Sequence, residues 1–235
     1  MSNPRAIVHI GTHRTGTTSL QGFLGAAERP LLRPQGFRYY SGVHQAAGHV
    51  ELHMAAMREG RSSPARRSFR PIPKSTVTAR VQAFLALAGK DASVFSGEGL
   101  SYLRHLDEIE ALKEVFVGAD VRIVLYLREK QSFLRSYRAF LDHANLRTRD
   151  DPQSFGYAEQ DSWLLDYDAL VAAYVRGFGR RNVSVLRYER EIARHGGVVG
   201  SFLAAIGVQT HGLDLAEPRL RATAGAGVAA RPPMG

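Results

Sequence analysis

The sequence contains no cysteine among its 235 residues. A disulfide framework, a zinc site built from thiolates and a cysteine nucleophile are therefore excluded. Runs of about 18 apolar residues, which a membrane-spanning helix needs, are also lacking. Residues 1–5 lead into a first strand without the apolar core of a signal peptide. These absences predict a cytoplasmic protein with no membrane span.

Acidic side chains are few relative to basic ones. The 22 Asp and Glu residues face 31 Lys and Arg residues, which gives a formal net charge of +9 and a pI near 10.2. Such a balance indicates an anionic partner. The arginines are scattered and no zinc finger, RRM or KH signature is present, so we do not expect nucleic acid as the partner. A cofactor with several phosphate charges, with or without an acidic acceptor, accounts for the positive net charge equally well.

Hydrophobic periodicity predicts alternating strands and helices, and hence an α/β fold with a parallel sheet of about four or five strands between two helical layers. Extended segments are expected at residues 6–10, 36–40, 92–96, 121–127 and 183–188. Helices are expected at residues 17–27, 46–58, 76–88, 107–117, 164–178 and 197–206, and after residue 128. We expect one domain over residues 1–215, a mobile basic loop without regular structure over 60–75, and a flexible tail over 216–235.

Residues 7–18 form the most informative stretch. A β-branched strand ends at Gly11, and Gly16 opens a helix that begins with two threonines. Such a strand–loop–helix unit holds phosphate with backbone N–H groups and the helix dipole. The two glycines have Walker A spacing, but Thr17 stands where that motif has lysine, and the basic residue, Arg14, lies inside the loop. An ordinary nucleotide triphosphatase is therefore disfavoured.

The string Arg14-Thr15-Gly16-Thr17-Thr18 resembles the 5′-phosphosulfate loop of sulfotransferases that use 3′-phosphoadenosine-5′-phosphosulfate (PAPS). The wider string from His9 to Gln21 looks like the opening of bacterial members associated with carbohydrate acceptors. The resemblance implies a P-loop NTPase-like three-layer fold and a reaction that needs no metal. It also implies that PAPS is held by the loop residues Gly11, Thr12, Arg14, Thr15, Gly16, Thr17 and Thr18.

Two further motifs agree with this resemblance, and they follow the loop along the chain in the same order as in the family. An apolar strand at 121–127 ends in Arg128, and Ser136 follows eight residues later, which is the spacing of the family's pair for the 3′-phosphate. Lys130 stands where many members have proline, a turn residue rather than a ligand. Tyr188 follows another strand and is implied to stack on the adenine, a contact worth about 1–3 kcal/mol.

Sulfuryl transfer needs cations and N–H donors at the leaving oxygen, and a base for the acceptor proton. Arg14 is the candidate for the first role, acting by charge and bidentate hydrogen bonding because a guanidinium keeps its proton. Glu98 follows the strand at 92–96, beyond the carboxyl end where ligands bind in open α/β sheets, and is our candidate base. Some family branches have a catalytic glutamate there and others use histidine. His13, inside the loop, is therefore the rival group and is expected to contact phosphate or acceptor.

The remaining polar motifs are less specific. His9 is expected inside the sheet, satisfied by a neighbour. His49 and His53 share one helical face, but the glutamate of a His-Glu-x-x-His site is missing, so we interpret this face as solvated and expect no metal. The basic segment Arg219–Gly227 either closes over the cofactor or remains a solvated tail.

The leading interpretation is a sulfotransferase that moves the sulfuryl group of PAPS to a hydroxyl or amine. The resemblance favours a carbohydrate or glycolipid acceptor, with small metabolites and peptide tyrosine left open. One alternative is a P-loop kinase-like phosphotransferase that uses ATP, and another is a non-enzymatic protein that binds anions or nucleic acid. Residues 36–75 and 142–163, which lie between the cofactor motifs, are expected to choose the acceptor. The oligomeric state is left open.

Overall fold

The computed structural model describes residues 3–42 and 48–210, in which five parallel strands form one sheet. The strands lie in the order β2-β3-β1-β4-β5. They are β1 (Arg5–Gly11), β2 (Phe37–Tyr39), β3 (Ala92–Ser96), β4 (Asp120–Leu127) and β5 (Val183–Arg187). Each agrees with the expected segment to within one residue at either end, and the parallel sheet of the sequence prediction is confirmed.

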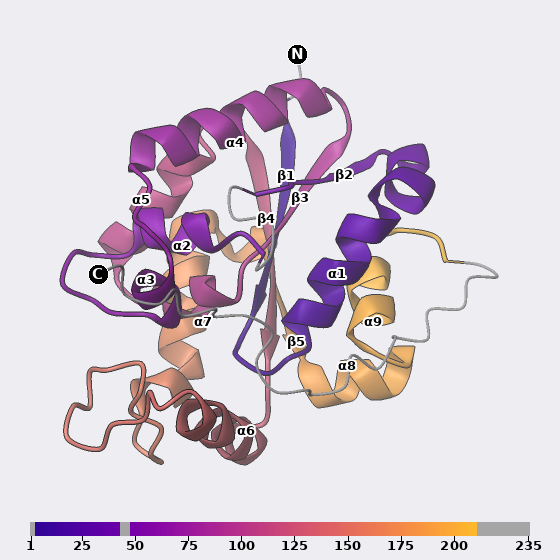
Figure 1. Ribbon diagram of the computed structural model, residues 1–235. Helices are drawn as coiled ribbons and strands as arrows, with labels where there is room; N and C mark the ends of the chain where they lie inside the picture. Colours follow the sequence, from indigo (N-terminus) through magenta and orange to yellow (C-terminus); the bar gives the residue numbers. More distant parts are fainter. Residues whose placement is uncertain (1–2, 43–47, 211–235) are drawn as a thin grey trace, which may run out of the picture.

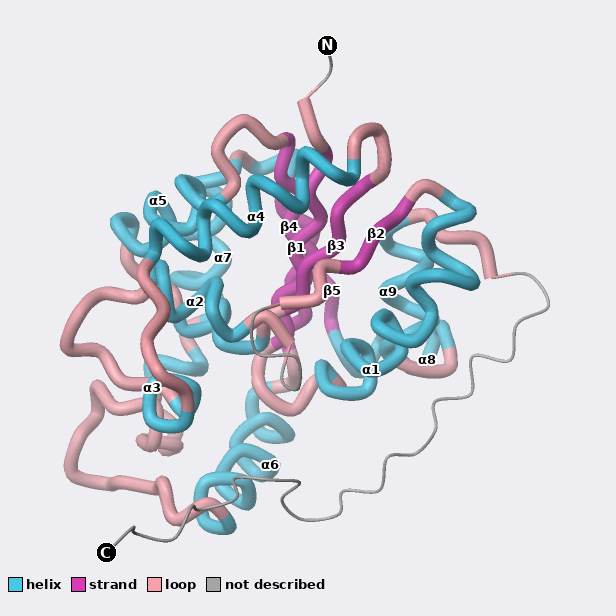
Figure 2. Tube along the Cα trace, turned by 45° about the horizontal axis from the view of Figure 1, so that its top comes forward, coloured by secondary structure: helices cyan, strands magenta, loops and turns pink. Residues whose placement is uncertain are grey.

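Helices cover both faces of the sheet (Figure 1). One face packs against α1 (Thr17–Ala27) and α9 (Val198–Ile206). The other is covered by α2 (Val50–Ala56), α4 (Lys74–Ala88), α5 (Leu106–Val115) and α7 (Tyr167–Phe178). At the carboxyl ends of the strands lie α6 (Lys130–His143), which extends beyond the sheet in Figure 2, and α8 (Tyr188–His195). These are the three layers of the expected P-loop NTPase-like fold.

The central strand, β1, positions the site. Its side chains are buried on both faces: Val8 and Ile10 belong to one core cluster, and Ile7 belongs to the cluster formed with α1 and α9. From β1 the chain passes to β2 and β3 on one side, and later to β4 and β5 on the other. The strand order thus reverses at β1, and a ligand crevice opens at the carboxyl ends of the strands at such a point. The segment that leaves β1 there is the predicted phosphate loop.

Residues 60–75 contain a short helix that the sequence does not predict. They include α3 (Pro64–Ser68), which is capped by Ser63, whose Oγ accepts a hydrogen bond from Arg66 N at 3.2 Å. The Arg66 guanidinium donates at 2.6–3.2 Å to four carbonyl oxygens, those of Met54, Met57, Arg58 and Arg61. The segment is therefore held by side-chain bonds to backbone carbonyls five to twelve residues earlier in the chain, which leave no periodic apolar pattern in the sequence.

A buried carboxylate holds the same segment. Glu108, on α5, is fully buried, and each of its oxygens lies 2.7 Å from Arg61 Nη1. It also accepts hydrogen bonds at 2.9–3.2 Å from the backbone N–H groups of Arg58, Arg104 and His105. Burial opposes ionisation, but Arg61 and the N–H donors hold the pKa of Glu108 below its ordinary value. The carboxylate is therefore charged at neutral pH and needs its cation.

Replacing Arg61 is expected to destabilise the fold strongly. Arg61→Met would leave the Glu108 carboxylate buried without its cation, and removing one partner of such a pair costs about 3–5 kcal/mol. Chemical denaturation should show this loss in the free energy of unfolding. Arg70→Met, at an exposed position of the same segment, should leave that free energy almost unchanged. Equal stability of the two variants would show that Arg61 and Glu108 do not act as a structural pair.

His49 and His53 are buried, with 2% of each residue exposed, so the predicted solvated face is wrong. His49 Nδ1 accepts a hydrogen bond from Ser96 N at 2.9 Å, and its Nε2 lies 2.6 Å from Tyr40 O. His53 Nε2 lies 3.1 Å from Ser63 Oγ. Burial lowers the pKa of His49 to about 4 and that of His53 to about 3. Both rings are neutral at physiological pH, which is why the core can accommodate them.

Other predictions have mixed outcomes. His9 is fully buried as expected, and its Nδ1 lies 2.8 Å from Ser96 Oγ. The helix α8 is not expected from the sequence, and Tyr188, predicted to end a strand, begins it. Only Tyr188 and Ile192, four residues apart, give α8 an apolar side, and both are partly buried against the core, so its apolar pattern is too short to predict a helix. Arg219–Gly227 and the whole of the predicted tail over 216–235 lie outside the described residues. Within residues 3–42 and 48–210, every helix is too short or too polar to cross a membrane.

Candidate functional site

The loop between β1 and α1 closes tightly over Gly11. A Cβ there would overlap the hydroxyl oxygens of Thr15 and Thr17, so only glycine fits. Gly16 has a φ of +73°, and a Cβ on it would lie 2.9 Å from Val198 Cγ1. Both glycines of the motif are thus needed for this path of the chain. Because α1 follows directly, its first N–H groups and its dipole stabilise an anion placed at the loop.

Arg14 lies where four segments meet. Its φ is +67°, a left-handed conformation that costs a non-glycine residue roughly 1–3 kcal/mol. Its backbone N donates to Glu98 Oε1 at 3.1 Å, its Nε donates to Ser136 Oγ at 3.0 Å, and its carbonyl accepts from Arg128 Nη1 at 2.7 Å. The sequence interpretation placed Arg14 and Arg128 at opposite ends of one nucleotide. In the structure they are in direct contact, and the Arg14 side chain reaches Ser136.

The loop threonines differ in their surroundings. Thr15 is fully buried, and its hydroxyl donates to Thr12 O at 2.7 Å, so it braces the loop from within. Thr12 and Thr17 are buried as well. Thr18 is exposed and lines two cavities on the outer side of α1. The hydroxyls of Thr15 and Thr17 lie 3.4 Å apart over Gly11, whereas Thr18 is on the exposed side of the helix.

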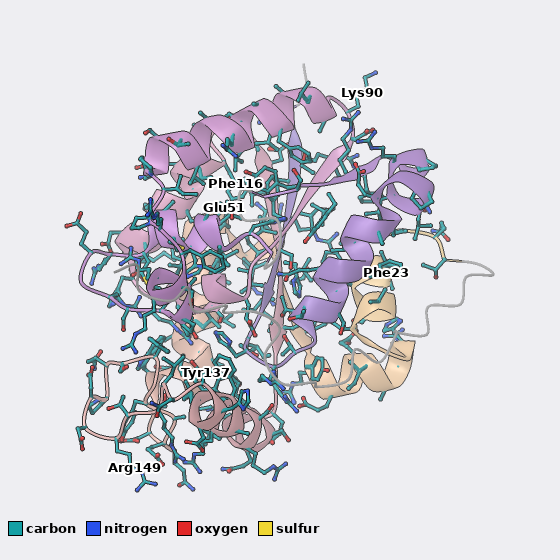
Figure 3. The ribbon with its side chains drawn as sticks, viewed as in Figure 1. Phe23, Glu51, Lys90, Phe116, Tyr137 and Arg149 are labelled. Atoms are coloured by element: carbon teal, nitrogen blue, oxygen red, sulfur yellow. The ribbon has the colours of Figure 1, made fainter. Side chains whose placement is uncertain are left out.

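His13 and Glu98 are in contact, with His13 Nδ1 3.1 Å from Glu98 Oε1. The imidazole packs against the rings of Tyr102 and Tyr137, with centroid distances of 4.8 and 5.1 Å. These two tyrosines are hydrogen-bonded to each other, their oxygens 2.9 Å apart, and Figure 3 shows Tyr137 on α6 below the sheet. Aromatic contacts and the carboxylate thus fix the imidazole. Its Nε2 is buried and has no hydrogen-bond partner among the described residues.

Glu98, the predicted base, is a carboxylate held by partners from the loop. Burial opposes its ionisation, but His13 and the backbone N–H of Arg14 hold the pKa of Glu98 below its ordinary value. Glu98 is therefore ionised at neutral pH, although its lowered pKa makes it a weaker base than an ordinary glutamate. Burial raises the pKa of Tyr102 and of Tyr137, so these hydroxyls stay protonated and do not serve as bases.

Arg128 and Tyr188 lie together beside the loop. The Arg128 guanidinium carbon is 5.7 Å from the centre of the Tyr188 ring, and Arg128 Nε is 3.6 Å from Glu189 Oε1. Tyr188 and Glu189 line a cavity of about 470 Å³ that continues to Val198, at the start of α9. A cation and an aromatic ring beside a cavity are suited to a ligand that carries both phosphate and a flat ring.

A different cavity, of about 270 Å³, lies against Glu98 and His13. Segments from α1, α2 and α3 enclose it. Its apolar walls come from Val50, Pro64, Ala65, Phe69 and Tyr102. The carboxylate therefore faces a space for a small, largely apolar group, separate from the cavity at Tyr188.

The comparisons with known proteins agree with this geometry. The model of the sulfotransferase family matches residues 5–212. The chain belongs to this family. The crystal structure of a sulfotransferase from Alicyclobacillus acidocaldarius is similar, with a TM-score of 0.58 and 19% identity over 90% of this chain and 83% of that one. A sulfotransferase domain from the curacin biosynthetic pathway has a TM-score of 0.46 and 12% identity over 89% and 76% of the two chains. At 19% identity, the first likeness shows the fold alone. None of the curated protein sequences matches.

Sequence reasoning missed part of the site of this sulfotransferase. Gln21 lines the cavity at Glu98 and lies three residues after Thr18 on α1, a spacing that places both on one helix face and could have revealed it. Tyr102 packs on His13 from a short helical turn after β3. No local signal marks that contact, because it depends on how separate segments meet.

Proposed function

We propose that this protein transfers the sulfuryl group of PAPS to a hydroxyl or amine of an acceptor, and that the acceptor is a carbohydrate or glycolipid. The observation that carries the proposal is the contact of Glu98 with the loop, 3.1 Å from Arg14 N and 3.1 Å from His13 Nδ1. If Glu98 is the base, as we propose, this contact holds it beside a phosphate-type loop. Membership of the sulfotransferase family supports the reaction class. The resemblance of residues 9–21 to carbohydrate-type members supports the acceptor class.

The donor lies across the loop in this proposal. Its 5′-phosphosulfate takes the N–H groups at the start of α1, and its 3′-phosphate binds Arg128 and Ser136. Because Arg14 Nε donates to Ser136 Oγ at 3.0 Å, the 3′-phosphate replaces that contact and frees the Arg14 guanidinium for the 5′ side. Tyr188, beside Arg128 and the cavity of about 470 Å³, stacks on the adenine.

The reaction is an in-line displacement at sulfur. The acceptor oxygen forms a bond to sulfur while the bond from sulfur to the bridging oxygen breaks, which releases 3′-phosphoadenosine-5′-phosphate (PAP). The acceptor proton passes to Glu98, which His13 and Arg14 keep ionised although burial opposes it. Arg14 and the N-terminus of α1 stabilise the charge that develops on the leaving phosphate. His13 orients Glu98 and lies against the acceptor cavity.

Labelled-sulfate transfer tests this proposal. PAPS carrying ³⁵S is incubated with a panel of hydroxyl and amine acceptors in the presence of EDTA, and the expected result is a labelled product with one PAP formed per sulfate moved. A parallel incubation with γ-labelled ATP and magnesium tests the kinase-like alternative, against which the threonine at position 17 argues. Label that moves only from ATP would contradict the proposed reaction.

A further inference from the structure

The side chain of Glu189 connects the start of α8 to the turn between β4 and α6. We call residues 128–129, which join that strand to that helix, the β4–α6 turn. Both carboxylate oxygens of Glu189 accept a hydrogen bond from Glu129 N, at 3.2 Å for Oε1 and 3.1 Å for Oε2. Its Oε1 also lies 3.6 Å from Arg128 Nε. Glu189 therefore contacts both residues of the turn.

This contact continues the pairing of β4 with β5. The last backbone pair of the two strands is Leu127 with Arg187, and Glu129 and Glu189 each lie two residues further along the chain. Both chains turn into helices there, so the carboxylate supplies the acceptor that a longer strand would have offered to the next N–H group. A helix cannot supply it either, because the N–H groups at its start have no acceptor within the helix. Glu189 thus closes the end of the ladder between β4 and β5.

The β4–α6 turn has few other means of holding its shape. Proline, whose ring would fix the backbone, is absent from residues 128–131. The carboxylate of Glu129 caps α6, where it accepts hydrogen bonds at 2.7–2.9 Å from two backbone N–H groups of the first turn. Among the described residues, the acid paired with Arg128 is therefore Glu189. The position of Arg128 depends on this one carboxylate from a different segment of the chain.

The Arg128 guanidinium is held on two sides. Its Nη1 donates to Arg14 O at 2.7 Å, and its Nε is buried beside Glu189. The ring of Tyr188, the residue before Glu189, lies 5.7 Å from the guanidinium carbon. A guanidinium that is already fixed loses less conformational freedom when it binds a phosphate, so the complex is more stable. Whatever fixes the β4–α6 turn therefore affects how well Arg128 binds its ligand.

The charge of Glu189 does not itself favour an anion at Arg128. A carboxylate within 4 Å of the cation repels a bound phosphate and compensates part of the positive charge that attracts it. The Glu189 side chain is 44% exposed, so solvent screens this repulsion in part. An uncharged hydrogen-bond acceptor would be better on electrostatic grounds alone. The bond to Glu129 N, and not the charge, is therefore the feature that can support phosphate binding.

We propose that Glu189 is a positioning residue of the donor site, and that it aims Arg128 at the 3′-phosphate by fixing the β4–α6 turn. The inference rests on the proposed function, in which Arg128 binds this phosphate of PAPS. Glu189 acts without touching the nucleotide. It nevertheless sets how strongly the protein prefers PAP to AMP, which lacks the 3′-phosphate.

Two substitutions at this position separate the hydrogen bond from the charge. Glu189→Ala removes both, whereas Glu189→Gln keeps an oxygen that accepts from Glu129 N and removes only the charge. Isothermal titration calorimetry with PAP and with AMP gives the Kd of each variant. Glu189→Ala should weaken PAP binding by about tenfold or more, as the loss of a charge-assisted hydrogen bond does, and leave AMP binding nearly unchanged. Glu189→Gln should bind PAP as tightly as the unaltered protein, or more tightly.

The control is Asp168→Ala, which removes an exposed acid from α7 and should leave both affinities nearly unchanged. Circular dichroism establishes that the variants are folded. Undiminished PAP affinity in Glu189→Ala, equal weakening of PAP and AMP, or a Glu189→Gln variant as weak as Glu189→Ala would overturn the inference. The unaltered protein separates the two proposals. If it does not bind PAP, the proposed function fails and the inference with it, whereas equal PAP binding by the unaltered protein and Glu189→Ala contradicts the role of Glu189 alone.

Discussion

Arg128→Ala is expected to raise the dissociation constant for PAP by about 30- to 4,000-fold. Loss of a charge-assisted contact to a desolvated phosphate costs about 2–5 kcal/mol when the partner is left unpaired. The Arg128 side chain is mostly buried and is held in place by Arg14 O and the Tyr188 ring. It is therefore positioned before the nucleotide arrives. Isothermal titration calorimetry with PAP measures the effect.

The loss of affinity should be specific for nucleotides that carry a 3′-phosphate, and this specificity distinguishes a ligand contact from a structural role of Arg128. AMP and adenosine 5′-phosphosulfate lack the 3′-phosphate, so their affinities should change little in Arg128→Ala. Arg135→Ala, which removes a charge from an exposed position of α6, is the matched control and should leave the PAP affinity nearly intact. Equal weakening of PAP and AMP would show that Arg128 acts by bracing the loop through Arg14 O and not at the 3′-phosphate.

Glu98→Gln is expected to lower turnover by roughly 100- to 10,000-fold, the range attributed to a positioned base. Glutamine keeps the shape of the side chain and can still accept the hydrogen bond from Arg14 N, which spans 3.1 Å in the structure. The Kd for PAP should stay the same or fall slightly, because a negative charge leaves an anion site. His13→Ala should impair both turnover and binding, because His13 belongs to the loop. Single-turnover kinetics with labelled PAPS separate the two effects.

The pH dependence of kcat/KM gives a second test of the base. The pKa of Glu98 is lowered, so a reaction that uses its carboxylate keeps its rate down to pH values below the ordinary glutamate pKa of about 4.3 and loses it as the group protonates. An unperturbed imidazole base would place this acid limb near pH 6.5. An acid limb near 6.5, together with near-normal turnover in Glu98→Gln, would assign the base to a histidine.

The sheet and the residues at the carboxyl ends of its strands could be predicted from the sequence because they follow from local signals. Gly11 ends an apolar strand, and Glu98 and Arg128 follow the ends of two others by two residues and by one. Parallel strands bring their carboxyl ends to one edge, so a correct strand prediction also places these residues together. The direct contacts of Arg14 with Glu98 and Ser136 are consistent with that reasoning, although the reach of Arg14 to Ser136 was not expected.

The parts that escaped prediction depend on contacts between distant segments. Arg66 holds residues 60–75 by donating to backbone carbonyls, and Arg61 does so through a carboxylate more than forty residues away. His49 is buried because Tyr40 O and Ser96 N satisfy its ring, which no spacing in the sequence reveals. Polar residues with such partners resemble solvated ones in the sequence, so hydrophobic periodicity assigns them to the surface.

Titration of the protein with PAP in the presence of EDTA tests the central claim, a donor site for PAPS at the loop, most directly. The account predicts one PAP bound per chain without magnesium, with an affinity well above that of AMP because Arg128 and Ser136 take the 3′-phosphate. ATP should bind weakly, with or without magnesium. ATP binding that requires magnesium and exceeds the affinity for PAP would contradict the account.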